Sequence, residues 1–119
     1  MGFFSRASKP KVTPTAIQTF DAWREAVIES DLPTILNVWS GSCPPCKRMV
    51  PVLEKVATRY AGKVQVVSVG TDAEPALLME LQIRATPTTI IYRGGEELGR
   101  MPGFRPVAWF DAMIEAELS

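Results

Sequence analysis

Residues 34–49 read TILNVWSGSCPPCKRM, and they contain the only two cysteines of the 119-residue chain. The almost continuous apolar run 34–39 is typical of a strand buried on both faces. Helical periodicity begins at Lys47, so Cys43 and Cys46 should lie where a strand gives way to the N-terminus of a helix. Free N–H groups and the positive end of the helix dipole favour a thiolate there. The segment predicts a dithiol that exchanges with disulfides.

The size and composition are those of one globular domain. A chain of 119 residues can bury a core without disulfide staples, and 46% hydrophobic and 22% charged residues are ordinary values. Thirteen basic and thirteen acidic residues cancel, so no preference for nucleic acid is indicated.

The sequence also indicates a compartment. No apolar run approaches the roughly 18 residues of a membrane span, and the N-terminal residues lack the apolar core of a signal peptide. We therefore expect a cytoplasmic monomer that binds neither nucleic acid nor membranes. In a reducing cytoplasm, a Cys-x-x-Cys pair is more often catalytic or metal-binding than structural.

Periodic segments on both sides of the cysteines complete an α/β pattern. In chain order we expect a short strand at 16–18, a helix capped by Thr19, the strand 34–39, a helix from Pro45 to about Tyr60 and a strand at 64–69. A helix at 72–81 capped by Asp72, a hairpin with strands at 88–92 and 97–101, and a closing helix that is entered through Pro106 and reaches Leu118 should follow. The first two long strands, joined by a helix, imply a parallel pair, and the hairpin adds antiparallel strands.

The predicted architecture is one α/β domain. It has a mixed central sheet of four to five strands with helices on both faces. We place this domain at residues 15–119. Residues 1–14 contain three basic residues, two prolines and no acid, and we expect them to form a flexible N-terminal tail.

Two alternatives to redox chemistry are weak for this cysteine pair. A zinc or iron site takes about four Cys or His ligands, whereas the chain has two cysteines and no histidine. Only a site shared between subunits could complete such a shell. A purely structural disulfide in a four-residue ring would stabilise little. We therefore expect a redox-active disulfide between Cys43 and Cys46, without a metal or another bound cofactor.

The chain resembles the thioredoxin family at several separate positions. Residues 38–47 look like the family's strand and active-site segment, and Pro51 stands at the place of its helix-kinking proline. Residues 83–88, which read IRATPT, are similar to the segment that holds the family's cis-proline. Gly95 falls in the hairpin turn, and Gly103 matches a glycine beside the active site. The spacings agree over most of the chain.

The resemblance implies a thioredoxin fold and a thiol–disulfide oxidoreductase that reduces disulfides in client proteins. Cys43 would be the exposed nucleophile and Cys46 the buried resolving thiol. Further site residues implied in this way are Asn37, Trp39, Pro44, Pro45 and Lys47 as support, and Ser42, Thr86, Pro87, Gly103 and Phe104 as client contacts. Pro87 would be cis and lie against the cysteines, and an extended client segment would pair with the backbone of Thr86. A flavin- and NADPH-dependent thioredoxin reductase would regenerate the dithiol.

The sequence departs from the family pattern around the motif. Pro44 stands where glycine is usual, so we expect a stiffer dithiol loop and a helix that begins no earlier than Pro45. Asn37 replaces a buried aspartate, and Ser68 is nearest to the place of its lysine partner. An asparagine cannot titrate, so water or the thiols themselves would carry the proton. We interpret Asn37 as a hydrogen-bonded buried amide.

Aromatic residues near the motif also differ from the family. Ser42 replaces a tryptophan, which makes the rim smaller and more polar. We expect Trp39 to pack in the core beneath the site. Phe104 either restores apolar surface beside Gly103 or packs inward, and the residues favour neither.

Two other functions remain compatible with the sequence. Pro44 and a threonine before the cis-proline are found among disulfide oxidases and isomerases that resemble this chain, whereas the lack of an export signal argues against that function. Loss of the buried aspartate–lysine pair leaves open a protein-binding adaptor that keeps its thiols incidentally. A reduction potential separates the reductase from an oxidant, and an activity assay separates both from an adaptor.

Overall fold

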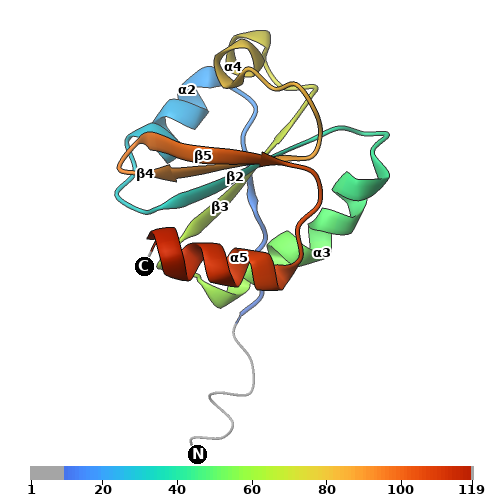
Figure 1. Cartoon of the computed structure of the whole chain (residues 1–119). Helices are drawn as coiled ribbons and strands as arrows, with labels where there is room; N and C mark the ends of the chain where they lie inside the picture. The colour runs from blue at the N-terminus through green and yellow to red at the C-terminus, as the bar shows by residue number, and fades with distance from the viewer. Residues whose placement is uncertain (1–9, 119) are drawn as a thin grey trace, which may run out of the picture.

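A mixed sheet with β2 at its centre organises the molecule (Figure 1). The computed structural model describes residues 10–118. Within them the strands are β1 (Thr15–Ala16), β2 (Thr34–Trp39), β3 (Gln65–Gly70), β4 (Thr88–Arg93) and β5 (Glu96–Pro102), in the spatial order β1-β3-β2-β4-β5. β2 runs parallel to β3 and antiparallel to β4, and β5 is an exposed edge strand. The predicted sheet is confirmed.

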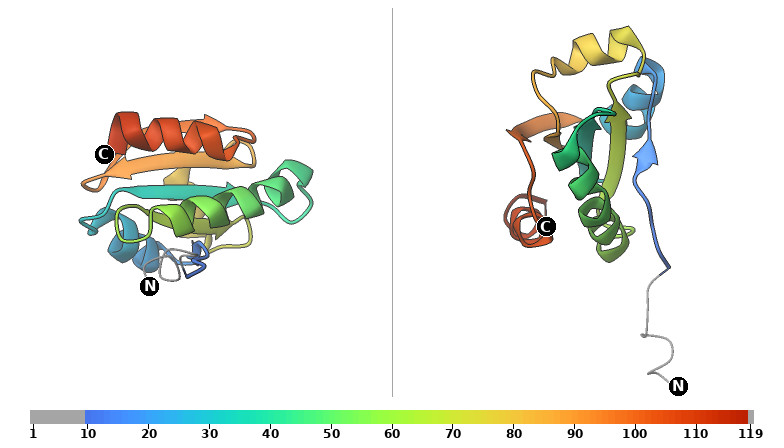
Figure 2. Two further views of the ribbon diagram at one scale, coloured as in Figure 1. Left: turned by 90° about the horizontal axis from the view of Figure 1, so that it is seen from below. Right: turned by 90° about the vertical axis from the view of Figure 1, so that its right-hand side faces the viewer.

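Helices cover both faces of this sheet (Figures 1 and 2). They are α2 (Phe20–Trp23) with its π-helical continuation η1 (Arg24–Ile28), α3 (Pro44–Arg59), α4 (Pro75–Leu81), and α5 (Val107–Met113) with its π-helical continuation η2 (Ile114–Leu118). One core lies under α2, η1 and α4, and the other lies under α3, α5 and η2. None of the helices in residues 10–118 is long and apolar enough to cross a membrane.

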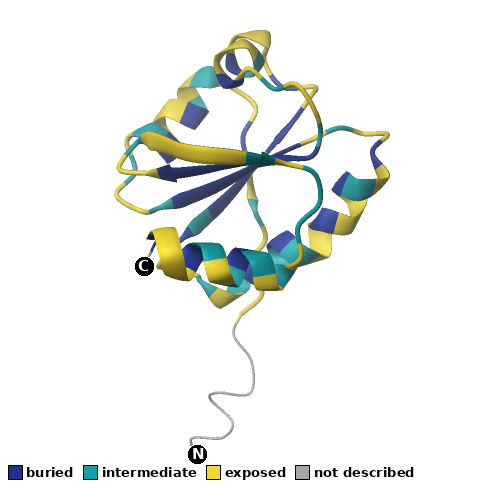
Figure 3. Ribbon diagram, viewed as in Figure 1, coloured by how far each residue is buried: buried dark blue, intermediate teal, exposed yellow. Residues whose placement is uncertain are grey.

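The strand β2 contributes side chains to both cores. Leu36 and Val38 belong to the core under α2 and α4, whereas Ile35 belongs to the core under α3 and α5. Successive side chains on a strand point to opposite faces, so Asn37 faces α3 together with Ile35. Figure 3 shows the central strands buried between their helices. A polar side chain is thus placed beneath the helix that carries the cysteines.

Two helices begin at residues other than those predicted. α3 begins at Pro44, one residue earlier than expected, and α4 begins at Pro75 with Glu74 rather than Asp72 as its N-cap. A proline fits the first turn because the N–H groups there have no intrahelical acceptor. The N–H of Glu74 donates to the carbonyl oxygen of Gln18 at 2.8 Å, which holds the segment before α4 outside the helix.

Two local signals of the sequence are confirmed. The hydroxyl of Thr19 accepts a hydrogen bond from the N–H of Ala22 at 3.1 Å, as expected of an N-cap. Gly94 and Gly95 have φ of 60° and 80°, and they connect β4 to β5. Positive φ at both central residues is the geometry of a two-residue hairpin turn.

The segment before β1 runs along α3. Val12 exchanges two hydrogen bonds with the Thr58 hydroxyl, at 2.9 and 3.2 Å. Lys11 Nζ lies 3.6 Å from Glu54 Oε1. Residues 1–9, which contain most of the expected tail, lie outside the described residues, so the boundary between tail and domain stays a prediction.

Candidate active site

The two cysteines form a disulfide at the N-terminus of α3. Their Cα atoms are 5.2 Å apart, and Cys43 is the N-cap of the helix. Pro44 and Pro45 occupy the first two helical positions and have no N–H groups. The N–H of Cys46 is therefore the first free donor of the helix, and it donates to Cys43 Sγ at 3.2 Å. The same donor would stabilise a thiolate at Cys43.

The disulfide form does not show the expected difference in exposure between the cysteines. Cys43 is 6% exposed and Cys46 is 4% exposed. The reason is local, because Cys43 Sγ lies between the Cys46 N–H and the carbonyl oxygen of Thr86, from which it is 3.6 Å away. Nucleophile and resolving thiol cannot be told apart by burial in this form.

The loop that contains Pro87 lies against the disulfide. The Thr86–Pro87 peptide bond is cis, as expected, and the Thr86 carbonyl faces Cys43. The Pro87 carbonyl oxygen accepts a hydrogen bond from the N–H of Gly103 at 2.8 Å. The Pro87 loop therefore links the disulfide to the loop at Gly103, so three distant parts of the sequence lie side by side.

A hydrogen bond also joins this loop to the segment before the cysteines. The hydroxyls of Ser40 and Thr86 are 2.9 Å apart. Ser40 is absent from the predicted site residues. The sequence feature that could have indicated Ser40 is its position, because it is a small polar residue between a buried strand and the cysteine motif. Ser42, two residues on, is exposed beside the disulfide.

The loop after β5 provides the other rim of the site. Gly103 has a φ of 89°, which favours glycine. Phe104 is half-buried and packs against the core under α3 and α5, while the Arg48 guanidinium lies 5.1 Å from its ring centre. Of the two arrangements considered for Phe104, the structure has the inward one, with part of the ring left at the surface.

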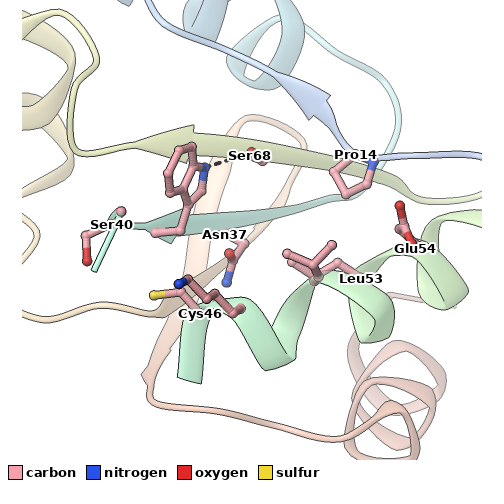
Figure 4. Close-up of a pocket in the computed structure, with 11 residues that line it drawn as sticks. Pro14, Asn37, Ser40, Cys46, Leu53, Glu54 and Ser68 are labelled. Carbon is pink, nitrogen blue, oxygen red and sulfur yellow. Dashed lines mark hydrogen bonds between the residues drawn. The ribbon is translucent and has the colours of Figure 1, made fainter. Parts of the chain in front are cut away.

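A pocket of about 370 Å³ lies on the other side of Cys46 (Figure 4). It is bounded by β2, β3, the first turns of α3 and the segment before β1. Its lining residues are Pro14, Asn37, Trp39, Ser40, Gly41, Cys46, Lys47, Val50, Leu53, Glu54 and Ser68. Residues 10–118 contain no group of three or more Cys, His, Asp and Glu side chains that could hold a metal ion.

Trp39 lines this pocket rather than packing in the core, which corrects the prediction. It is 37% exposed, and its Nε1 donates to Ser68 Oγ at 3.2 Å. The indole lies across β3, where a Cβ on Gly70 would approach its ring to 2.8 Å. Glycine at that position makes room for the ring beside the strand.

Asn37 is buried as predicted, but its amide nitrogen is not hydrogen-bonded. The residue is 2% exposed, and its Nδ2 has no hydrogen-bond partner within residues 10–118. Its neighbour in the parallel register is Ser68, whose hydroxyl instead accepts from Trp39. Lys47, at the pocket rim, donates its backbone N–H to the Cys43 carbonyl at 3.1 Å.

Two thiols that open and close one disulfide carry two electrons without another group. The fold and the site therefore define a thiol–disulfide oxidoreductase. Comparison with known proteins gives the family, because the family model named Thioredoxin matches residues 14–116. The chain belongs to the thioredoxin family.

Individual relatives agree with this family. Thioredoxin 1 of Nostoc sp. is 32% identical over 84% of this chain and 94% of its own length. The thioredoxin of Synechocystis sp. is 33% identical over 85% of this chain and 95% of its own, and the chloroplastic M-type thioredoxin of Spinacia oleracea is 34% identical over 82% and 54%. The Malassezia sympodialis thioredoxin structure superposes with a TM-score of 0.80 over 93% of this chain and 95% of its own, at 24% identity. That likeness concerns the fold.

Proposed function

We propose that the protein reduces disulfides in client proteins, with Cys43 as the nucleophile. The Cys43 thiolate attacks a client disulfide, so that a Cys43–client disulfide forms and the first client thiolate leaves. The Cys46 thiolate then attacks Cys43, the internal disulfide forms, and the second client thiolate leaves. The two electrons gained by the client come from the Cys43–Cys46 dithiol.

The position of the Cys43 sulfur supports this proposal best. It lies 3.2 Å from the Cys46 N–H at a helix N-terminus, where an anion is stabilised. It also lies 3.6 Å from the Thr86 carbonyl oxygen, at the edge of the loop that we expect to bind clients. A sulfur in this position lies next to its activating donor and next to the loop proposed to bind clients.

Client binding is proposed for the rim formed by two loops and the residue before the motif. An extended client segment would pair with the backbone of Thr86, beside the cis bond to Pro87. The further contacts proposed are Ser42, Gly103 and the exposed part of Phe104. Such a rim recognises an extended backbone more than a particular sequence.

The proposed electron donor is a flavin- and NADPH-dependent thioredoxin reductase in the cytoplasm. The protein would need no bound cofactor for this, since its own disulfide accepts the electrons. Chloroplastic thioredoxins are among the relatives, so localisation of the tagged protein is the direct test of the compartment.

Oxidation or isomerisation of disulfides is the second candidate, because Pro44 and a threonine before the cis-proline, here Thr86, are also found among such relatives. Pro44 and Pro45 leave the thiolate one N–H donor in the first turn and fix two φ angles of the loop, which changes the relative stability of the disulfide and dithiol forms. A reduction potential measured against glutathione decides. A value near or below the cytosolic glutathione potential supports the reductase, and a value well above it supports the oxidant.

Insulin reduction by dithiothreitol tests the activity. We expect wild type to accelerate it and Cys43→Ser to abolish the acceleration. Equal rates with both proteins would contradict the proposal. Cys46→Ser should instead retain clients as mixed disulfides with Cys43, and mass spectrometry would identify them.

A further inference from the structure

The amide nitrogen of Asn37 is a buried donor without an acceptor. The residue is 2% exposed, and Nδ2 makes no hydrogen bond within residues 10–118. A buried donor left in this state destabilises a fold, so native proteins rarely keep one without a reason. The disulfide form of the protein contains no evident reason.

The hydroxyl of Thr89 on β4 is in the same state and lies beside Asn37. Thr89 is fully buried, and its Oγ1 likewise has no partner in the part of the chain described. The two residues are directly opposite each other in the β2–β4 register, so they share one face of the sheet. That face is the one under α3, because the preceding pair, Ile35 and Ile91, belongs to the core there.

Cys46 belongs to α3, the helix that covers the sheet face shared by Asn37 and Thr89. Asn37 and Cys46 line the same pocket, and Figure 4 shows the Asn37 amide directed from β2 toward the helical turn of Cys46. In the disulfide the Cys46 sulfur is uncharged and bonded to Cys43. Reduction frees this sulfur, and a thiolate accepts hydrogen bonds from N–H and O–H donors.

We propose that Asn37 and Thr89 donate hydrogen bonds to the Cys46 thiolate in the dithiol form. Donors that are unsatisfied in the disulfide and satisfied in the dithiol favour reduction of the disulfide. They also lower the pKa of the Cys46 thiol without a carboxylate base. This inference rests on the proposed redox cycle.

The proton balance of the second exchange step follows from this arrangement. Cys46 loses its proton to water in the pocket, because neither the Asn37 amide nor the Thr89 hydroxyl is basic enough to take it. The resulting thiolate attacks Cys43, the Cys43–Cys46 bond forms, and the client sulfur leaves with the electron pair of the broken bond. The charged side chains around the pocket are Lys47 and Glu54 of α3, Lys11, which pairs with Glu54, and Asp72 beyond β3.

The test compares the dithiol–disulfide equilibrium of four proteins in glutathione buffers. They are wild type, Asn37→Leu, Thr89→Val and the control Thr34→Val. Thr34 lies on β2 as well, but its hydroxyl already bonds to Leu32 and Gln65. We expect Asn37→Leu to shift the equilibrium about tenfold toward the disulfide, or about 30 mV. Thr89→Val should shift it in the same direction, and Thr34→Val should leave it unchanged.

Two further measurements separate this role from a structural one. Asn37→Leu should lower the melting temperature of the reduced protein but not of the oxidised protein, which loses only an unsatisfied donor. In a Cys43→Ser background, Asn37→Leu should raise the pKa of Cys46. Equal changes in both redox forms, as a permanently bound water between Asn37 and Thr89 would cause, would overturn the inference. So would an unchanged equilibrium in both variants.

Failure of this inference is distinguishable from failure of the proposed function. A wild-type protein that does not equilibrate with glutathione contradicts the redox cycle itself. A wild-type protein that equilibrates normally, alongside variants with the same potential, contradicts only the role of Asn37 and Thr89.

Discussion

Trp39 and Trp23 lie on opposite faces of the sheet and have different surroundings. Trp39 is half-exposed at the pocket, with its indole N–H on Ser68, whereas Trp23 is buried under α2 and packs edge-on against Tyr92. Whether each tryptophan is buried therefore depends on the residues around it. The apolar run 34–39 and the family resemblance both led to the prediction that Trp39 packs in the core.

Substitution of each tryptophan tests this assignment. We expect Trp23→Ala to lower the free energy of unfolding by about 3–5 kcal/mol, as for a large core side chain. Trp39→Ala should lower it by about 1–2 kcal/mol, because one hydrogen bond and part of a packed surface are lost. Urea denaturation of both variants provides the comparison. Equal losses of unfolding free energy in the two variants would indicate that Trp39 packs in the core as Trp23 does.

The sequence predicted the reactive residues better than their surroundings. Cys43, Cys46 and Pro87 are tied to a motif and to a backbone geometry, so their meeting was foreseeable. The state of Asn37 was not, because strand alternation gives the face of a side chain but not its hydrogen-bond partners. Whether an acceptor lies within reach depends on the strand neighbours Thr89 and Ser68, which only the pairing register brings beside Asn37.

The hairpin turn between β4 and β5 contains two glycines with different neighbours. A Cβ on Gly95 would lie 2.5 Å from the carbonyl oxygen of Ile28, while a Cβ on Gly94 would meet nothing within 4 Å. Both have positive φ. Of the two glycines, only Gly95 lies close to the end of η1.

Matched alanine substitutions should separate strain from steric overlap. Gly94→Ala should lower the free energy of unfolding by about 1–2 kcal/mol, the cost of a left-handed alanine. Gly95→Ala should cost clearly more, because the backbone of η1 must also move. Thermal denaturation of the two variants is the measurement. A smaller loss at Gly95 would contradict the close approach of this glycine to Ile28.

Asp111 links the end of α3 to α5. Its carboxylate accepts hydrogen bonds from Tyr60 Oη and Arg59 Nη1, each at 2.5 Å. The Tyr60 hydroxyl, and secondly the Arg59 guanidinium, lower the pKa of Asp111 below its ordinary value of 3.8. A carboxyl with a lowered pKa stabilises the fold above its unfolded pKa, and this contribution disappears as the pH falls through the folded value.

Asp111→Asn should therefore reduce stability at neutral pH and flatten the loss of stability below about pH 4. The effect should be about 1 kcal/mol or less, because the pair is partly exposed to solvent. Urea denaturation between pH 2 and 7 measures it, with Glu80→Gln on α4 as a surface control. If Asp111→Asn lost stability between pH 4 and pH 2 as steeply as wild type, the lowered pKa of Asp111 would not be the cause of that loss.

Element order was more predictable than element ends. Periodicity and turn signals predicted each strand of the sheet and the parallel and antiparallel pairs. The start of α4 was misplaced because Asp72 is a good cap by residue type, yet the N–H of Glu74 is held by Gln18, far away in sequence. The π-helical ends of the first and last helices have no signal in residue periodicity.

At the scale of the whole molecule, the segment before β1 decides where the domain begins. Val12 is bonded to Thr58 of α3, although the sequence places it in the tail. We expect removal of residues 1–9 to leave stability unchanged. Removal of residues 1–13 should lower the free energy of unfolding by about 1–2 kcal/mol through loss of the two hydrogen bonds.

Both truncated proteins should still accelerate insulin reduction, since the disulfide and the cis-proline loop remain. Urea denaturation and the insulin assay on the same preparations check the two expectations. Loss of activity in the shorter protein would show that the segment 10–13 takes part in the chemistry. The domain would then have to be extended beyond the predicted boundary at residue 15.

The two outer strands of the sheet are poor templates for another chain. β1 offers two residues, and β5 ends at Pro102, which has no N–H, while Glu97 and Arg100 place charges along its surface. Edge strands that are short or charged discourage the addition of a strand from another chain and the growth of fibrils. The sheet therefore offers other chains little opportunity to add a strand at either side, which limits self-association of the protein through its sheet edges.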